Sequence, residues 1–149
     1  MAKELPEMTL KVIGVVRNEM KEPGGRSNIQ DIVSEVVLDE SLAGSLDSLD
    51  EYSDVTIIYW CHVDSNPGPK SNKIYPHRDE SNPLVGFFAT RASDRPNRFG
   101  MCAAKLLEVG SNKLRVSGLD AIDGSPVIDI KPYNSRHDSR PDAKMPPWS

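Results

Sequence analysis

Short apolar runs, separated by polar segments that contain Gly and Pro, make up most of the chain. Runs of this length that are rich in β-branched residues and end in turn residues predict β-strands. The most apolar run, Asp54–Val63, is the best candidate for a central strand, and Gly14 predicts a bulge or a close backbone approach. Seven strands are expected, over Met8–Val16, Asp31–Leu38, Asp54–Val63, Leu84–Thr90, Cys102–Val109, Lys113–Gly118 and Pro126–Pro132.

Helical spacing is confined to one short segment. Leu42, Leu46 and Leu49 recur at i, i+4 and i+7, which predicts a brief helix over Ala43–Leu49. No long helical pattern alternates with the strands and no GxGxxG is present, which argues against a doubly wound sheet. The pattern therefore predicts a mainly β protein, either a sandwich or a barrel, with a short helix and long loops.

Two segments lack any regular pattern. Asp64–Pro83 is rich in proline and polar residues and predicts a long, mobile loop. The tail from Asn134 to Ser149 is polar, and we expect Trp148 to anchor it on the body or on a partner chain. At 149 residues the chain fits one domain, with residues 1–133 as its body and 134–149 as a polar C-terminal tail.

Composition changes this picture little. Apolar residues make up 38% of the chain and charged residues 27%, as in an ordinary globular protein. The longest apolar run, Val55–Cys61, is far shorter than the roughly 20 residues of a membrane helix. The N-terminus MAKELPEM has charge and proline where a secretory signal is apolar, so we expect an intracellular protein without a membrane span. Cys61 and Cys102 have no zinc-site spacing and are expected to be buried free thiols.

Charge is informative only locally. A net charge of -4 argues against a surface coated in positive charge for wrapping duplex nucleic acid. Arg91, Arg95 and Arg98, however, fall within eight residues that include a single acid, Asp94. This local excess of guanidinium groups predicts a site for phosphate or carboxylate.

The arginines belong to Gly86–Met101, here called the arginine turn, which also contains Pro96 and Asn97. Arginine presents a planar fork of donors, asparagine adds a donor and an acceptor, and proline presets the turn. A solvated turn whose arginines pair with nearby acids is the alternative. The density of Pro, Asn and Gly favours a loop that grips a charged, hydrogen-bonding ligand.

A second segment, Gly118–Tyr133, is here called the acidic turn and carries Asp120, Asp123 and Asp129. The acids do not follow the Ca²⁺-loop spacing and no histidine accompanies them, so no metal site is expected. We expect one acid to orient a ribose or an amine and another to pair with an arginine of the arginine turn, with Lys131 and Tyr133 at the rim. Together the two segments predict a site for a nucleotide-like ligand.

Other candidates for chemistry are few. His62 follows the central strand and could act as a general base or only position a ligand. Ser93 and Ser125 belong to no nucleophile elbow or ordered triad, which makes serine hydrolysis an unfavoured interpretation.

Three segments resemble one known family: Ile13–Arg17 (IGVVR), Gly86–Met101 (GFFATRASDRPNRFGM) and Gly118–Tyr133 (GLDAIDGSPVIDIKPY). They are similar to the hallmarks of the TrmO family of tRNA N6-threonylcarbamoyladenosine methyltransferases, also described as TsaA-like proteins. The family pattern is approximately FATR followed by RPNPIG in the second segment and LDLLDGTPVLDIKPY in the third. The resemblance extends from Leu10 to Tyr133 and marks residues 1–133 as a TsaA-like domain.

This resemblance implies a small β-barrel that works as a cytoplasmic homodimer and methylates N6 of the modified adenosine beside the tRNA anticodon. The methyl donor would be S-adenosylmethionine. Matched positions imply cofactor contacts at His62, Val63, Arg91, Met101, Leu119, Asp120, Ala121 and Ile122. Arg95, Asn97 and Arg98 are the expected substrate contacts, and Asp120, Asp123, His62 and Tyr133 are the candidates for accepting the proton.

The chain departs from the family pattern at three places. Arg98 and Phe99 replace a proline and an aliphatic residue, and Pro23, Gly24 and Gly25 stand where bacterial members have Pro-Arg-Gln, with Arg26 close by. The chain also resembles the shorter archaeal-type members, without the C-terminal domain that helps bacterial members to hold tRNA. The alternatives are a methyltransferase for another acceptor and a module that binds S-adenosylmethionine without catalysis.

Overall fold

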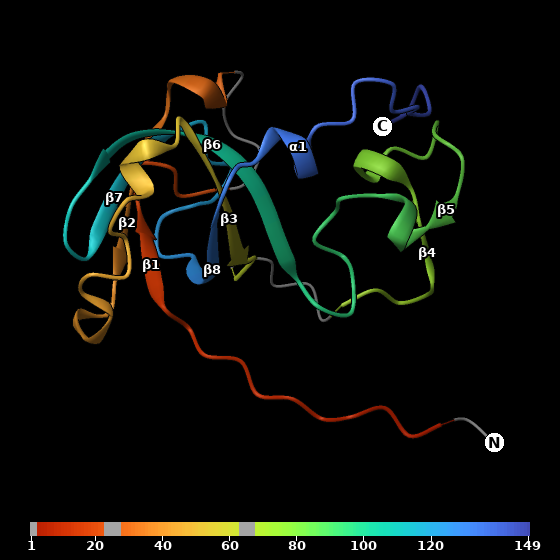
Figure 1. Cartoon of the computed structure of the whole chain (residues 1–149). Coiled ribbons are helices and arrows are strands. Elements are labelled where there is room, and N and C mark those ends of the chain that lie inside the picture. The colour runs from red at the N-terminus through yellow and green to blue at the C-terminus, as the bar shows by residue number, and fades with distance from the viewer. Residues whose placement is uncertain (1–2, 23–27, 63–67) are drawn as a thin grey trace.

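Six antiparallel strands close into one barrel in a computed structural model that describes residues 3–22, 28–62 and 68–149 (Figure 1). Their order around the barrel is β1-β2-β7-β6-β3-β8, and each neighbouring pair is antiparallel. The strands are β1 (Gly14–Arg17), β2 (Val33–Leu38), β3 (Asp54–Trp60), β6 (Phe99–Val109), β7 (Lys113–Ser117) and β8 (Pro126–Pro132). The mainly β fold is therefore confirmed, and the barrel is formed rather than the sandwich.

Alternating side chains build the core inside this barrel. In β3, Val55, Ile57 and Tyr59 are buried, while the residues between them are only partly covered. The same period of two buries Leu114 and Val116 of β7. Because successive strand residues point to opposite faces, this alternation places one face of every strand in a shared apolar interior.

The central position predicted for the Asp54–Val63 run is confirmed. β3 pairs with β6 on one side and with β8 on the other, and the β3–β8 register shifts between Ile58 and Tyr59. Such irregularities increase local twist and help a sheet to curve. At Gly14 the expected close approach is also present, because a Cβ there would lie 2.4 Å from the carbonyl oxygen of Val37.

The helix expected over Ala43–Leu49 is wrong. Two 3₁₀ turns form instead, at Glu40–Leu42 and Leu49–Glu51. Gly44 and Ser48 have φ of 87° and 66°, left-handed backbone that cannot continue a right-handed helix. Leu46 is nevertheless buried, so the leucine spacing reports packing onto the barrel and not a helix.

The strands expected over Met8–Val16 and Leu84–Thr90 are much shorter in the structure. The first run forms a ladder only at β1, preceded by the backbone hydrogen bonds of Ile13 to Val127 and Asp39, because residues 3–12 extend away from the barrel as an arm (Figure 1). The expected strand over Leu84–Thr90 is wrong beyond β5 (Val85–Gly86), since a 3₁₀ turn follows at Phe87–Ala89. β5 pairs with β4 (Lys73–Ile74) in a separate two-stranded sheet.

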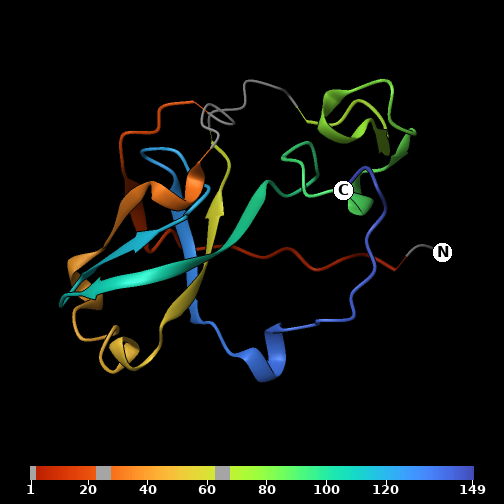
Figure 2. The same ribbon diagram turned by 90° about the horizontal axis from the view of Figure 1, so that it is seen from above.

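The long loop expected over Asp64–Pro83 is partly structured where it is described. Residues 68–83 contain β4 and a 3₁₀ turn at Pro76–Arg78, and this unit lies beside the barrel in both views (Figures 1 and 2). The tail forms a short helix, α1 (Ser135–Asp138), capped by the side chain of Asn134. It then returns to the β4–β5 unit, where Nε2 of His77 lies 3.1 Å from the carbonyl oxygen of Trp148.

Candidate functional site

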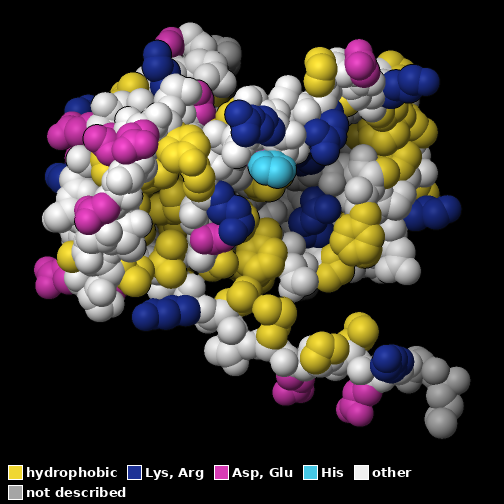
Figure 3. Space-filling view, viewed as in Figure 1, with side chains coloured by type: hydrophobic (Ala, Val, Ile, Leu, Met, Phe, Trp, Pro, Cys, Tyr) yellow, Lys and Arg dark blue, Asp and Glu magenta, His cyan; other side chains and the backbone are white. Residues whose placement is uncertain are grey.

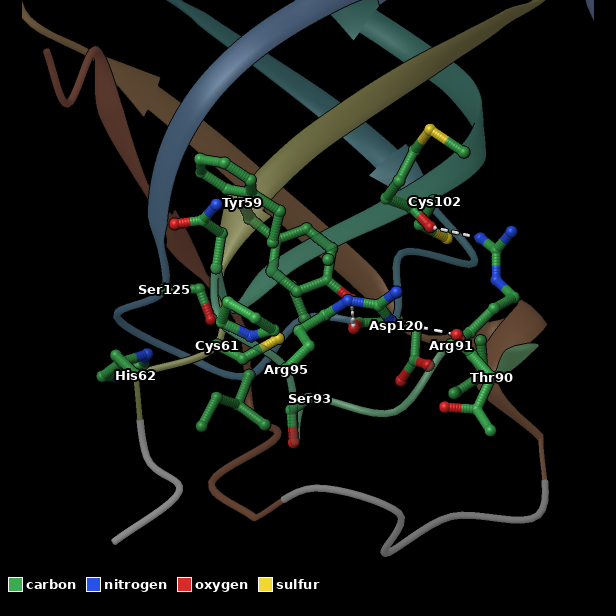
Figure 4. A pocket seen from close by; sticks show the side chains of 18 of the residues that line it. Tyr59, Cys61, His62, Thr90, Arg91, Ser93, Arg95, Cys102, Asp120 and Ser125 are labelled. Atoms are coloured by element: carbon green, nitrogen blue, oxygen red, sulfur yellow. Dashed lines mark hydrogen bonds between the residues drawn. The ribbon is translucent and has the colours of Figure 1, made fainter. Parts of the chain in front are cut away.

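The arginine turn and the acidic turn meet at one end of the barrel and enclose a cavity of about 1300 Å³ (Figure 4). The end of β3 supplies Tyr59, and Cys61 and His62 follow it directly. Volumes of several hundred Å³ and more are typical of small-molecule and cofactor sites. The two segments singled out in the sequence therefore form one site, although they lie far apart in the chain.

Asn18 holds the acidic turn against β1. Its Nδ2 donates to the carbonyl of Ala121 (2.7 Å) and to Oγ of Ser34 (2.9 Å), and its backbone N–H donates to Oδ1 of Asp123 (3.1 Å). Oδ1 of Asn18 accepts from the N–H of Met20 at 3.0 Å. With its side-chain amide and its backbone N–H engaged, Asn18 fixes the backbone that lines the cavity.

Asp123 contributes to this clamp and not to the cavity. Its carboxylate accepts from Nζ of Lys21 at 2.6 Å, and that hydrogen bond, followed by the one from Asn18, holds the pKa of Asp123 below its usual value. Because its pKa is lower in the folded than in the unfolded chain, ionised Asp123 stabilises the fold at pH values above the ordinary aspartate pKa. This stabilisation is lost as the pH falls through the lowered pKa.

Asp120 has the opposite environment. It lines the cavity, and desolvation by the surrounding protein raises the pKa of its carboxyl above the ordinary value. Its carbonyl accepts a hydrogen bond from the hydroxyl of Tyr59, a buried residue whose own pKa is raised, chiefly by desolvation. Burial likewise raises the pKa of the Cys102 thiol, so both groups stay neutral near pH 7.

The arginines organise their own turn while facing the cavity. Arg95 Nη1 donates to the carbonyls of Thr90 and Ala92, both at 3.0 Å, and its guanidinium lies 5.9 Å from the centre of the Phe88 ring. Arg91 Nη2 donates to the carbonyl of Met101 at 2.9 Å. A guanidinium carries more N–H donors than these bonds use, so both side chains retain capacity for an anionic ligand.

Eight of the residues selected from the sequence line this cavity: His62, Arg91, Arg95, Asn97, Met101, Asp120, Ala121 and Ile122. Four do not. Leu119 is fully buried, Asp123 belongs to the clamp, and Arg98 accepts a backbone hydrogen bond from Cys61 at 2.9 Å. Tyr133 donates its N–H to Asp54 at the start of β3, whereas the cavity lies at the end of that strand.

Val63 and the early loop with Pro23, Gly24, Gly25 and Arg26, where the chain departs from the family pattern, lie outside the described residues. The assignment of Val63 as a cofactor contact stays a prediction, as do the roles assigned to the residues that line the cavity.

Several lining residues were not selected from the sequence, among them Tyr59, Cys61, Gly100, Cys102 and Ser125. Tyr59 and Cys61 are alternate residues of the most apolar run, a pattern that predicts side chains buried in the core. Gly100 faces Tyr59 so closely that a Cβ would lie 2.3 Å from Cζ of the ring. The sequence around Ser125 indicates only an unfavoured role as a nucleophile. Its position within the acidic turn is the signal that could have placed it at the cavity.

Within residues 3–22, 28–62 and 68–149, no group of three or more His, Cys, Asp or Glu side chains is arranged to hold a metal ion. None of the helices described there has the length and apolar composition to cross a bilayer.

The chain is similar to several named proteins. It is 37% identical over 134 residues to an S-adenosyl-L-methionine-binding protein of Archaeoglobus fulgidus, covering 88% of this chain and 93% of that one. It is 41% identical over 95 residues to a mouse tRNA (adenine(37)-N6)-methyltransferase, covering 64% of this chain and 22% of the mouse protein. A crystal structure of TrmO from Pseudomonas aeruginosa superposes with a TM-score of 0.76 at 28% identity, covering 95% of this chain and 62% of that chain.

A family model adds the decisive match. The model described as the tRNA-methyltransferase O N-terminal domain matches residues 15–139, which include both turns that enclose the cavity. The chain therefore belongs to the family of the tRNA-methyltransferase O N-terminal domain, which confirms the resemblance found in its sequence motifs.

Proposed function

We propose that this protein transfers a methyl group from S-adenosylmethionine to N6 of threonylcarbamoyladenosine in tRNA, next to the anticodon. The observation that carries the proposal is the single cavity enclosed by the two turns that contain the family's motifs. The relatives named as S-adenosylmethionine-binding proteins and as a tRNA adenine methyltransferase support the cofactor and the enzyme class. The cofactor is S-adenosylmethionine, and the enzyme is a tRNA methyltransferase.

The lining residues match the charges of both ligands. The carboxylate of Asp120 favours the sulfonium cation, and the arginines Arg91 and Arg95 suit the carboxylates of the cofactor and of the threonyl group. The proton of N6 must leave as the methyl group arrives, and Asp120 or His62 is the acceptor available in the cavity. S-adenosylhomocysteine would be the leaving product, and alignment of the two ligands by the lining residues would supply part of the rate enhancement.

The direct test is incubation with labelled S-adenosylmethionine and tRNA that carries or lacks the threonylcarbamoyl group, followed by mass analysis of the nucleosides. Methyl transfer only to the modified adenosine is expected. Equal transfer to both tRNAs would contradict the proposed substrate. If calorimetry detects cofactor binding but neither tRNA is methylated, the alternative of a binding module is favoured. The archaeal relatives are named as S-adenosyl-L-methionine-binding proteins, which agrees with that alternative.

Asp120→Asn is expected to flatten the pH dependence of cofactor binding. In the free protein the pKa of Asp120 is raised by desolvation, and a neighbouring sulfonium lowers it by favouring the carboxylate. Affinity should therefore be full above the free-protein pKa and fall as the pH drops through it, by at most about tenfold per pH unit. Calorimetry between about pH 4 and pH 7 measures this slope.

The matched control is Asp129→Asn, because Asp129 does not line the cavity and pairs with Lys131 at 3.2 Å. This control should keep the wild-type slope. An Asp120→Asn protein with that same slope would exclude Asp120 as the group that titrates with cofactor binding.

The proposed working form is a cytoplasmic homodimer. The N-terminal arm exposes Leu5 (84%), Met8 (80%), Leu10 (46%) and Val12 (51%), and apolar side chains are visible along it (Figure 3). Exposed apolar surface of this extent favours burial against another chain. Sedimentation analysis is expected to give twice the chain mass, and a monomer at all concentrations would contradict this form.

A further inference from the structure

One hydroxyl in the cavity is buried without a partner. Ser125 lines the cavity and is 0% exposed, yet its Oγ makes no hydrogen bond within the described parts of the chain. Oγ of Ser34, which is also fully buried, accepts from Asn18 at 2.9 Å. Because an unpaired buried hydroxyl costs free energy, buried polar side chains are nearly always paired. An unpaired hydroxyl at the wall of this cavity points to a ligand that hydrogen-bonds it.

The backbone fixes this hydroxyl in place. The N–H of Ser125 donates to the carbonyl of Ile122 at 3.1 Å, and its own carbonyl accepts from the N–H of Val16 at 3.0 Å. Gly124, with φ of +81°, makes the turn and donates to the carbonyl of Val16 at 2.8 Å. These bonds hold Ser125 in position, and its side chain points in among the other lining residues (Figure 4).

Two neighbours of Ser125 on the acidic turn, Ala121 and Ile122, line the same cavity and carry no charge. Ala121 and Ile122 are buried apolar residues of the same turn, and the ring of His62 lies against Gly124, where a Cβ would be 3.6 Å from Nε2. The arginines that suit carboxylates belong to the opposite turn. A neutral hydroxyl that both donates and accepts suits a neutral ligand group with donors and acceptors, which describes a nucleoside better than an amino acid.

We propose that Oγ of Ser125 hydrogen-bonds the adenosine half of S-adenosylmethionine. This inference rests on the proposed function, since it takes the cofactor from it, and it assigns to Ser125 a role in binding that the sequence did not suggest. The amino-acid half then extends toward the arginine turn, where Arg91 and Arg95 face its carboxylate.

Ser125→Ala is expected to have two opposite effects. It should raise the Tm of the free protein slightly, because the variant no longer buries an unpaired hydroxyl, and weaken S-adenosylmethionine binding roughly 3- to 10-fold. Ser34→Ala is the control for a merely structural serine, and it should lower Tm because the Asn18 amide loses a partner. A fall in Tm for Ser125→Ala would mean that its hydroxyl already has a partner in the free protein, and it would overturn the inference.

Calorimetry with fragments locates the contact. For 5′-methylthioadenosine, which keeps the nucleoside and lacks the amino acid, Ser125→Ala should reduce affinity by the same factor as for the whole cofactor. The inference would be overturned if Ser125→Ala binds this fragment as tightly as the wild type does, or if it binds S-adenosylmethionine as tightly. Either result would leave the proposed function intact. Failure of the wild type to bind S-adenosylmethionine would overturn both.

Discussion

Replacement of Gly100 by alanine is expected to collapse the cavity and abolish cofactor binding. A Cβ at this position would lie 2.3 Å from Cζ and 2.7 Å from the hydroxyl oxygen of Tyr59. Tyr59 is buried, and its hydroxyl donates to the carbonyl of Asp120, so the ring cannot move without disturbing the acidic turn. Overpacking of this kind costs about 1–3 kcal/mol of unfolding free energy.

Denaturant unfolding measures the loss of stability, and calorimetry with S-adenosylmethionine measures the loss of binding. Gly86→Ala is the matched control, because the nearest atom to a Cβ there is the carbonyl oxygen of Asn72 at 3.8 Å, an ordinary contact. The control should bind normally. If Gly100→Ala binds the cofactor as the wild type does, the ligand does not occupy the space beside Tyr59.

Asn18→Ala is expected to weaken cofactor binding at least tenfold although Asn18 does not line the cavity. The substitution removes the partner of Ser34 Oγ and of the Ala121 carbonyl, and each buried polar group left unpaired costs about 1–3 kcal/mol. Ala121 and Ile122 are then no longer held in the geometry that the cofactor requires. The affinity should fall even at temperatures where the variant is fully folded, so that unfolding cannot account for the loss.

The control for Asn18 is Asn112→Ala, which removes one long hydrogen bond of 3.4 Å to the carbonyl of Leu38. Calorimetry on both folded variants separates the two effects, because Asn112 does not contact the acidic turn. Equal binding by Asn18→Ala and the wild type would show that the turn keeps its shape without the clamp.

Much of the fold follows from the alternation of apolar and polar residues. The pattern of β3 and β7 placed those strands correctly because one face of each is buried in a closed barrel. The pattern gave wrong predictions where the backbone conformation of single residues determines the secondary structure. Nothing in the leucine spacing of residues 42–49 reveals the left-handed φ of Ser48. The expected strand over Met8–Val16 pairs with neighbouring strands only from Gly14 onward, and the apolar pattern does not show which of its residues have such neighbours.

The site was predictable as two segments but not as individual roles. Asp120 and Asp123 are three residues apart in a similar local sequence, yet only Asp120 lines the cavity. What separates them is the pairing of Asp123 with Lys21 and Asn18, residues about one hundred positions away. Tyr59 was missed for a related reason, since a strand residue that faces the core and one that faces a cavity at the barrel's end have the same pattern.

Hydrogen–deuterium exchange with and without S-adenosylmethionine tests the central claim most directly, because that claim is a joint site made by both turns. Amides within Gly86–Met101 and within residues 118–125 should both exchange more slowly when the cofactor is present. The connection between β6 and β7, at the far end of β6, should not change. Protection of one turn without the other, or protection confined to the β6–β7 connection, would contradict the account.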